Sequence, residues 1–150
     1  MSGIINSVGS RSGVIGSTEI PGGYEEGTWT PTTGGTSSET VNRAKYIKIG
    51  NQVTISFDLS ISTIGTGSTT TLSGLPFANP SDNLTYPVNI KYFVSLAHDV
   101  IWMVGDIANN GSTMTFNTRD NKATQIDTSS AILGNSTRII GTGTYFINIA

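Results

Sequence analysis

The sequence predicts an all-β fold, an antiparallel β-sandwich or jelly-roll-like domain that carries an extended N-terminal arm. Ser, Thr, Asn and Gly are abundant, whereas Leu, Glu and Lys are scarce. Thr suits a pleated surface, and Gly and Asn suit tight turns. Apolar and polar residues alternate along several segments, and no window of about 11 residues has the apolar spacing of a helix. Composition and periodicity therefore favour strands joined by turns.

The strongest alternation lies between residues 43 and 61. Tyr46-Ile47-Lys48-Ile49 leads into Gly50-Asn51, and the apolar residues that then alternate with polar ones are Val53, Ile55, Phe57, Leu59 and Ile61. A two-residue loop that begins with Gly is typical of a type II′ turn. The pattern predicts an antiparallel hairpin between residues 43–49 and 52–61.

Further strands are predicted downstream. A second alternation runs through Val88, Ile90, Tyr92, Val94 and Leu96. The run 100–104, which includes Trp102, lacks alternation and predicts a strand buried on both faces. It should form a hairpin, through Asn109-Asn110-Gly111, with a strand that contains Met114 and Phe116. Residues 138–140 and 145–149 predict two strands around a turn at 141–143, which makes about eight strands in all, as in a sandwich or jelly roll.

Residues 1–23 differ from the rest of the chain. Ser2-Gly3-Ile4-Ile5-Asn6-Ser7 recurs ten positions later as Ser12-Gly13-Val14-Ile15-Gly16-Ser17. The segment is too rich in Gly for a stable helix and too poor in apolar residues for a core. Pro21-Gly22-Gly23 interrupts regular structure, so we expect an extended docking arm over 1–23 and the β-sandwich domain over 24–150.

The arm needs a partner to become ordered. Its candidate docking residues are Ile4, Ile5, Val8, Val14, Ile15 and Ile20. Burying them yields roughly 1.5 to 3 kcal/mol each, whereas fixing about 20 residues costs roughly 1 to 2 kcal/mol per residue. Burial alone is therefore insufficient. The arm must also pair with a sheet edge, or several tethered copies must bind together, and both routes favour an oligomer.

Composition excludes several classes of function. The net charge of -2 and the pI near 5.1 argue against nucleic acid as a partner, because nucleic-acid binders concentrate Lys and Arg. Without Cys, neither a disulfide framework nor a thiolate metal site is expected. We expect no secretory signal, no membrane-spanning segment and no cofactor. The charged share of 12% is low and favours surfaces that contact neighbouring subunits.

The residues that could act as catalytic groups are not arranged as catalysis requires, and the chain is expected not to be an enzyme. His98-Asp99 could form a general base and its orienting carboxylate, but adjacent residues rarely achieve that geometry. Glu25 and Glu26 should point to opposite faces of a strand, so they suit a glycosidase pair poorly. The other carboxylates are dispersed at Asp58, Asp82, Asp99, Asp106, Asp120 and Asp127. Gly65-Thr66-Gly67-Ser68 lacks the Lys of a phosphate-binding loop.

Aromatic residues are the candidates for surface recognition. Tyr24, Trp29 and Tyr86 could form a platform on which a sugar ring stacks, although such residues more often lie in a core or a subunit interface. Trp102 is expected to be buried. Trp29, close to Pro31, fits either environment.

Four stretches resemble a β-domain common in bacteriophage tail-fibre and other virion proteins. They are Tyr24-Glu25-Glu26-Gly27-Thr28-Trp29-Thr30-Pro31, Tyr46-Ile47-Lys48-Ile49-Gly50-Asn51-Gln52-Val53, Gly74-Leu75-Pro76-Phe77 and Gly143-Thr144-Tyr145-Phe146-Ile147. The segments Ser2-Gly3-Ile4-Ile5-Asn6-Ser7 and Arg11-Ser12-Gly13-Val14-Ile15-Gly16 resemble the leader that precedes that domain in phage structural proteins. The resemblance implies a homotrimer on the exterior of the phage particle, made in the host cytoplasm.

The resemblance does not determine where on the phage particle the protein lies. Our leading hypothesis is a non-enzymatic head-decoration, or cement, protein whose arms bind neighbouring capsid subunits. The alternative is a tail-attached short fibre or receptor-binding protein that recognises a host surface glycan or protein. A free-standing carbohydrate-binding module or hydrolase is a third hypothesis. Under both the head-decoration and the tail-attached hypotheses, deleting residues 2–20 should leave the domain folded and abolish its incorporation into particles.

Overall fold

The computed structural model describes residues 22–80, 84–109, 111–121 and 131–148. The described residues form eight strands, which are β1 (Tyr24–Thr28), β2 (Ser38–Ile49), β3 (Gln52–Thr63), β4 (Thr71–Ser73), β5 (Tyr86–Val94), β6 (Trp102–Ile107), β7 (Thr113–Arg119) and β8 (Thr137–Phe146). All strand pairs are antiparallel. The predicted all-β, antiparallel class is confirmed. None of these residues belongs to a helix long enough to cross a membrane.

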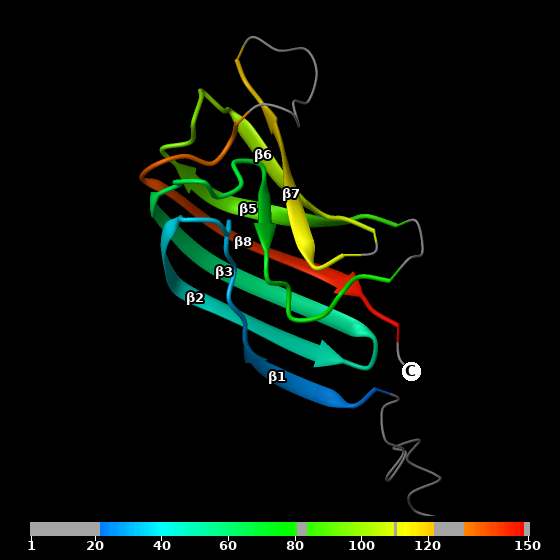
Figure 1. Ribbon diagram of the computed structural model, residues 1–150. Helices are drawn as coiled ribbons and strands as arrows, with labels where there is room; N and C mark the ends of the chain where they lie inside the picture. Colours follow the sequence, from blue (N-terminus) through cyan, green and yellow to red (C-terminus); the bar gives the residue numbers. More distant parts are fainter. Residues whose placement is uncertain (1–21, 81–83, 110, 122–130, 149–150) are drawn as a thin grey trace, which may run out of the picture.

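The strands join into one sheet in the order β1-β2-β3-β8-β5-β6-β7-β4. In Figure 1, β6, β7 and β4 run steeply across the direction of β2, β3 and β8, so the single sheet curls over itself and encloses a sandwich-like core. Thr32, in the segment after β1, forms a bridge with Ser73 of β4 through two backbone hydrogen bonds of 3.1 and 2.8 Å. The chain that follows the first strand therefore meets the last strand of the sheet.

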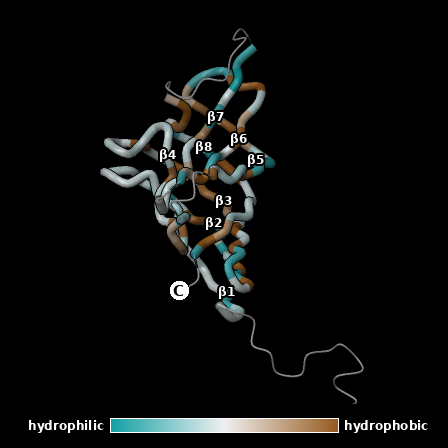
Figure 2. Tube along the Cα trace, turned by 90° about the vertical axis from the view of Figure 1, so that its right-hand side faces the viewer, coloured by the Kyte–Doolittle hydropathy of each residue, from teal (hydrophilic) through white to brown (hydrophobic). Residues whose placement is uncertain are grey.

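The predicted hairpin of residues 43–49 and 52–61 is confirmed. β2 pairs with β3 in a register that places Ile49 opposite Gln52, which leaves Gly50 and Asn51 as the loop. Gly50 has a φ of 61°, as the first loop residue of a type II′ turn requires. The side chains of β3 that face the core are Val53, Ile55, Phe57, Leu59 and Ile61. Figure 2 shows the corresponding alternation of hydropathy along the strands.

A β-bulge interrupts the predicted alternation in β5. Val88 and Ile90 are buried, but the register with β8 shifts between Ile90 and Tyr92. An extra residue in one strand reverses the faces of the residues that follow it. Phe93 therefore packs against the core, while Tyr92 and Val94 are exposed. The expectation that Tyr92 and Val94 would share a face with Val88 was wrong.

The expectation of a strand at 100–104 buried on both faces was also wrong. The strand starts at Trp102, and only one of its faces is covered, because Met103 and Ile107 are buried while Trp102 is 43% exposed. The predicted hairpin partner is correct, since Ile107 lies opposite Met114 in β7. The apolar run thus reflects one ordinary core face and one exposed aromatic side chain.

The C-terminal turn predicted at 141–143 is absent, because β8 runs without interruption through those residues. Gly141 and Gly143 lie where neighbouring side chains close over the strand. A Cβ atom at Gly141 would lie 2.9 Å from the side chains of Ile90 and Phe57, and one at Gly143 would lie 2.7 Å from Val88 Cγ2. These glycines serve close packing within the sheet and do not mark a loop.

Candidate functional site

The sheet has two different faces. The inner face carries the core, and we call the opposite face of β1, β2, β3, β8, β5, β6 and β7 the outer face. Cross-strand pairing places polar side chains of neighbouring strands beside one another on the outer face, in a row formed by Thr28, Lys45, Ser56, Thr142 and Asn89. A second row contains Glu26, Ile47, Thr54 and Thr144. The outer face thus offers hydroxyl, amide and charged groups to a polar partner.

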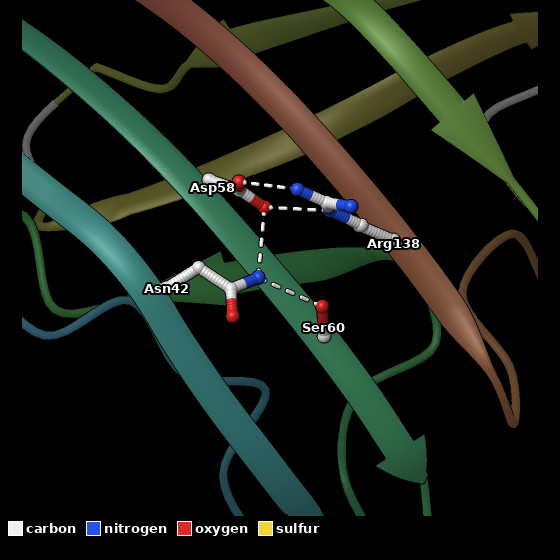
Figure 3. A network of polar contacts seen from close by, with 4 residues as sticks. All are labelled: Asn42, Asp58, Ser60 and Arg138. Atoms are coloured by element: carbon white, nitrogen blue, oxygen red, sulfur yellow. Dashed lines mark hydrogen bonds and ion pairs between the residues drawn. The ribbon is translucent and has the colours of Figure 1, made fainter.

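An ion pair with defined geometry lies on this face (Figure 3). Arg138 of β8 binds Asp58 of β3 through two hydrogen bonds, from Nε to Oδ1 at 2.9 Å and from Nη2 to Oδ2 at 2.7 Å. Asn42 donates from Nδ2 to both Asp58 Oδ1 and Ser60 Oγ, each at 2.9 Å. The hydrogen bonds from Arg138 lower the pKa of Asp58, and the same contacts raise the pKa of Arg138. Both pKa shifts favour the charged forms of the two side chains.

Sequence features explain how this cluster forms. The register between β2 and β3 shifts between Val41 and Arg43, so Asn42 is an extra residue at a bulge. A bulge redirects the side chain of its extra residue, and here the Asn42 amide reaches across to β3. On the other side, the Arg138 guanidinium lies 5.9 Å from the centre of the exposed Tyr92 ring. Strands β2, β3, β8 and β5 thereby share one polar and aromatic surface.

Two shallow clefts hollow the surface. The first has a volume of about 420 Å³ and lies over β1, β2 and β3, where Glu26, Lys45, Thr54 and Ser56 are among its lining residues. The second has a volume of about 520 Å³ and is lined by His98, Asp99, Val100, Ile101, Asp120 and Asn121. Both combine carboxylate, hydroxyl or amide groups with an aliphatic side chain. This mixture suits a polar ligand that also presents an apolar patch.

His98 lies in the second cleft, next to the loop that follows residue 130. Its Nδ1 atom is 2.9 Å from the carbonyl oxygen of Ala131. The backbone therefore holds the ring through Nδ1. In a catalytic triad, a carboxylate binds this same nitrogen. Glu25 and Glu26 diverge as expected, since Glu25 accepts a hydrogen bond from Tyr46 at 2.6 Å and Glu26 accepts one from Tyr24 at 2.7 Å.

The other carboxylates named from the sequence lie in several different places. Asp106 accepts a hydrogen bond from Asn117, and partial burial raises its pKa. Asp99 and Asp120 line the second cleft, while Asp82 and Asp127 lie outside the described residues. Within the described residues, no group of three or more His, Asp or Glu side chains could hold a metal ion.

The three aromatic candidates lie in different environments. Tyr24 is 60% exposed, at the start of β1. Trp29 is only 6% exposed, packs edge-on against Phe57 at 5.8 Å and donates from Nε1 to Ser56 O, which removes its ring from the surface. Tyr86 is partly buried, with its ring centre 5.9 Å from that of Phe146. They do not form one platform.

Two other aromatic residues are exposed, contrary to what was expected from the sequence. Trp102 and Tyr92 project from the neighbouring strands β6 and β5, and both are exposed. Tyr92 is exposed because of the bulge in β5, and Trp102 is exposed because only one face of β6 is covered. Neither feature leaves a signal in a local apolar pattern. The arm lies outside the described residues up to position 21. This part includes its predicted docking residues, from Ile4 to Ile20, and its two leader-like segments.

The fold has a counterpart among solved structures. The crystal structure of Dettilon tailspike protein (gp208) is similar to this chain, with a TM-score of 0.64 and 17% sequence identity. The similarity covers 83% of this chain and 24% of the tailspike chain, so this chain corresponds to about a quarter of that protein's length. No family model and no curated protein match the chain. At this level of identity the likeness shows a shared fold.

Proposed function

We propose that the chain is a non-enzymatic bacteriophage virion protein, carried on the tail, whose outer sheet face contacts the surface of the host cell. The observation that carries the proposal is the shared fold with a tailspike protein over 83% of the chain. It favours the tail-attached alternative over head decoration, the leading hypothesis from the sequence. The four sequence stretches that resemble phage virion β-domains support the same class independently.

The outer face supplies chemistry that suits a host glycan or a polar protein surface. Rows of hydroxyl and amide groups can exchange hydrogen bonds with sugar hydroxyls, and the exposed rings of Tyr92 and Trp102 can stack against apolar sugar faces. Arg138 and Asp58 hold each other in place, which keeps this part of the surface ordered before a ligand binds. Binding of this kind requires no catalytic residue.

Competition for adsorption tests the proposal. Purified full-length protein, preincubated with host cells, should slow the adsorption of the phage that encodes it. A double variant, Tyr92→Ser with Trp102→Ser, should stay folded, because both side chains are exposed, and should lose most of the competition. Thermal unfolding of the variant provides the control for folding. Host cells that neither bind the wild-type protein nor show slower adsorption would exclude a receptor-binding role.

The number of copies of the protein per particle distinguishes a tail location from a head location. A tail appendage is present in few copies, whereas a head-decoration protein covers the capsid with hundreds, so densitometry of purified particles distinguishes them. We also propose a homotrimer, which light scattering of the purified protein tests. Release of reducing sugar from host envelopes by the protein, abolished by changing His98 or one Asp, would contradict the non-enzymatic proposal.

A further inference from the structure

The first strand lies at one edge of the sheet, with no described strand beyond it. Among the described residues, β1 pairs only with β2, whereas β4 at the other edge also bridges to Thr32. Next to the two ends of β1, the carbonyl oxygen of Gly23 accepts a hydrogen bond from Gly50 N, and the backbone N–H of Trp29 donates one to Ala44 O. Antiparallel strands direct alternate residues to opposite neighbours. Tyr24, Glu26 and Thr28 therefore direct their N–H and C=O groups away from β2, which is the pattern that accepts another strand.

Exposed apolar side chains lie beside this open edge. Tyr24 pairs with Ile49, and Glu26 pairs with Ile47, so Tyr24, Ile47 and Ile49 are neighbours on the outer face. All three are exposed. On the inner side, Gly27 lies against the ring of Tyr46, which packs edge-on against Phe77. A strand added to β1 would bring an apolar side chain onto each face if it carried two adjacent aliphatic residues.

We propose that residues 2–8 of another copy of this chain add to β1 as an extra strand, so that copies exchange their N-terminal arms. This segment carries Ile4 and Ile5 side by side and no charged residue. Adjacent residues in a strand point to opposite faces. One isoleucine would therefore cover Tyr24 and Ile47, and the other would cover Tyr46. The proposal shares with the proposed homotrimer the association of copies, but it does not depend on the tail location or on contact with the host.

The segment that directly precedes β1 in the same copy fits the edge poorly. Gly22 and Gly23 have φ values of 83° and 67°, as in a two-residue hairpin loop. Such a hairpin would place Glu19 directly opposite Glu26, and like charges in that position are destabilising. It would also pair Tyr24 with Pro21, which has no N–H to donate. Glu26 and Pro21 therefore disfavour pairing of β1 with the near part of the arm, and Glu26 favours an uncharged strand.

The length of the arm allows it to reach another copy. Residues 9–22 connect the proposed strand to Gly23, and an extended chain covers about 3.3 to 3.6 Å per residue. The connection can thus span about 45 to 50 Å, longer than the roughly 40 Å of β2. The second repeat, residues 12–17, is tethered too closely to β1 to reach as far.

A backbone substitution tests the proposal without disturbing the rest of the sheet. Glu26→Pro removes an N–H that faces the open edge and leaves the hydrogen bonds to β2 intact, as edge strands tolerate. Glu26→Ala is the matched control, because it removes the same charge and keeps the N–H. Sedimentation of full-length protein should show association of the wild type and Glu26→Ala. Glu26→Pro and the double variant Ile4→Asp with Ile5→Asp should dissociate about tenfold more readily.

Cross-linking identifies the partner. The chain contains no Cys, so protein with Ile5→Cys can be mixed and refolded with protein carrying Glu26→Cys, and the scan repeated with Cys at residues 3, 4 and 6. A disulfide between two chains is expected for one of these positions, and none when Ser112→Cys replaces Glu26→Cys. Wild-type protein that is monomeric, unchanged association of Glu26→Pro, or mixtures in which no arm cysteine forms a disulfide with the cysteine at position 26 of another chain would overturn the proposal.

Discussion

Arg138 and Asp58, on the adjacent strands β8 and β3, form a two-point ion pair on the outer face of the sheet. The planar guanidinium matches both carboxylate oxygens, a geometry that Lys does not reproduce. Asn42 donates a further hydrogen bond to the same carboxylate. The pair therefore orders the surface that we propose to contact the host.

Replacing the arginine should change the titration of its partner. In Arg138→Gln, the pKa of Asp58 should rise toward the ordinary value for Asp, because the hydrogen bonds and the positive charge that lower it are lost. Arg138→Lys should restore only part of the shift. The lowered pKa contributes stability above the unfolded-state pKa, and this contribution is lost as the pH falls through the folded-state pKa. NMR titration of the Asp58 carboxyl measures the effect.

Arg43 provides the control, since it lies opposite Asp58 in β2. Arg43→Gln should move the pKa of Asp58 less than Arg138→Gln does. Equal shifts in the two variants would mean that general charge, and not the two-point contact, lowers the pKa.

Tyr145 makes stability depend on pH in the alkaline range. Its side chain is fully buried, its hydroxyl donates to Phe77 O at 2.9 Å, and burial raises its pKa to about 12. The unfolded chain releases this proton near pH 10, before the folded chain does. Stability should thus be unaffected by this group below about pH 10 and fall between about pH 10 and 12, by roughly 2 to 3 kcal/mol.

Tyr145→Phe isolates this contribution. The variant should lose about 1 to 3 kcal/mol at neutral pH, because Phe77 loses a hydrogen-bond partner, and should show a smaller decline above pH 10. Urea unfolding at a series of pH values measures both effects. Parallel declines in the variant and the wild type would assign the alkaline sensitivity to other tyrosines.

Close packing at Gly143 makes it sensitive to a single methyl group. Gly143→Ala should destabilise the fold by about 1 to 3 kcal/mol, since the new Cβ would lie 2.7 Å from Val88 Cγ2. Gly111→Ala is the control, because the nearest atom to its Cβ is 3.7 Å away, and its effect should be below about 0.5 kcal/mol. Chemical unfolding curves compare the two, and similar losses would contradict the packing explanation.

The two tryptophans should differ sharply in their effect on stability. Trp29→Ala should cost about 3 to 5 kcal/mol, because it empties a buried site beside Phe57. Trp102→Ala should cost less than about 1 kcal/mol, because the side chain is exposed. Unfolding free energies for both variants test the assignment, and the reverse order would contradict it.

The sequence was informative where a local rule decided the structure. The hairpin of β2 and β3 follows from strict alternation and a Gly-first loop, and both are visible in one segment. The divergence of Glu25 and Glu26 follows from the two-residue period of a strand. These features need no knowledge of the neighbouring strands.

Prediction failed where a distant strand decided the structure. Gly141 and Gly143 are indistinguishable from turn residues until Ile90, Phe57 and Val88 are placed over them. The bulge in β5 depends on its pairing with β8. The ion pair of Arg138 and Asp58 joins residues eighty positions apart, so the ordered part of the outer face had no local signal.

The most direct test of the proposal that this chain is a tail-borne virion protein is its position on the phage particle. Gold-labelled antibody against the purified chain, applied to intact particles of the phage that encodes it, locates the protein by electron microscopy. Label confined to the tail is the result we predict. Label spread over the head, or particles that carry none of the chain, would contradict the account.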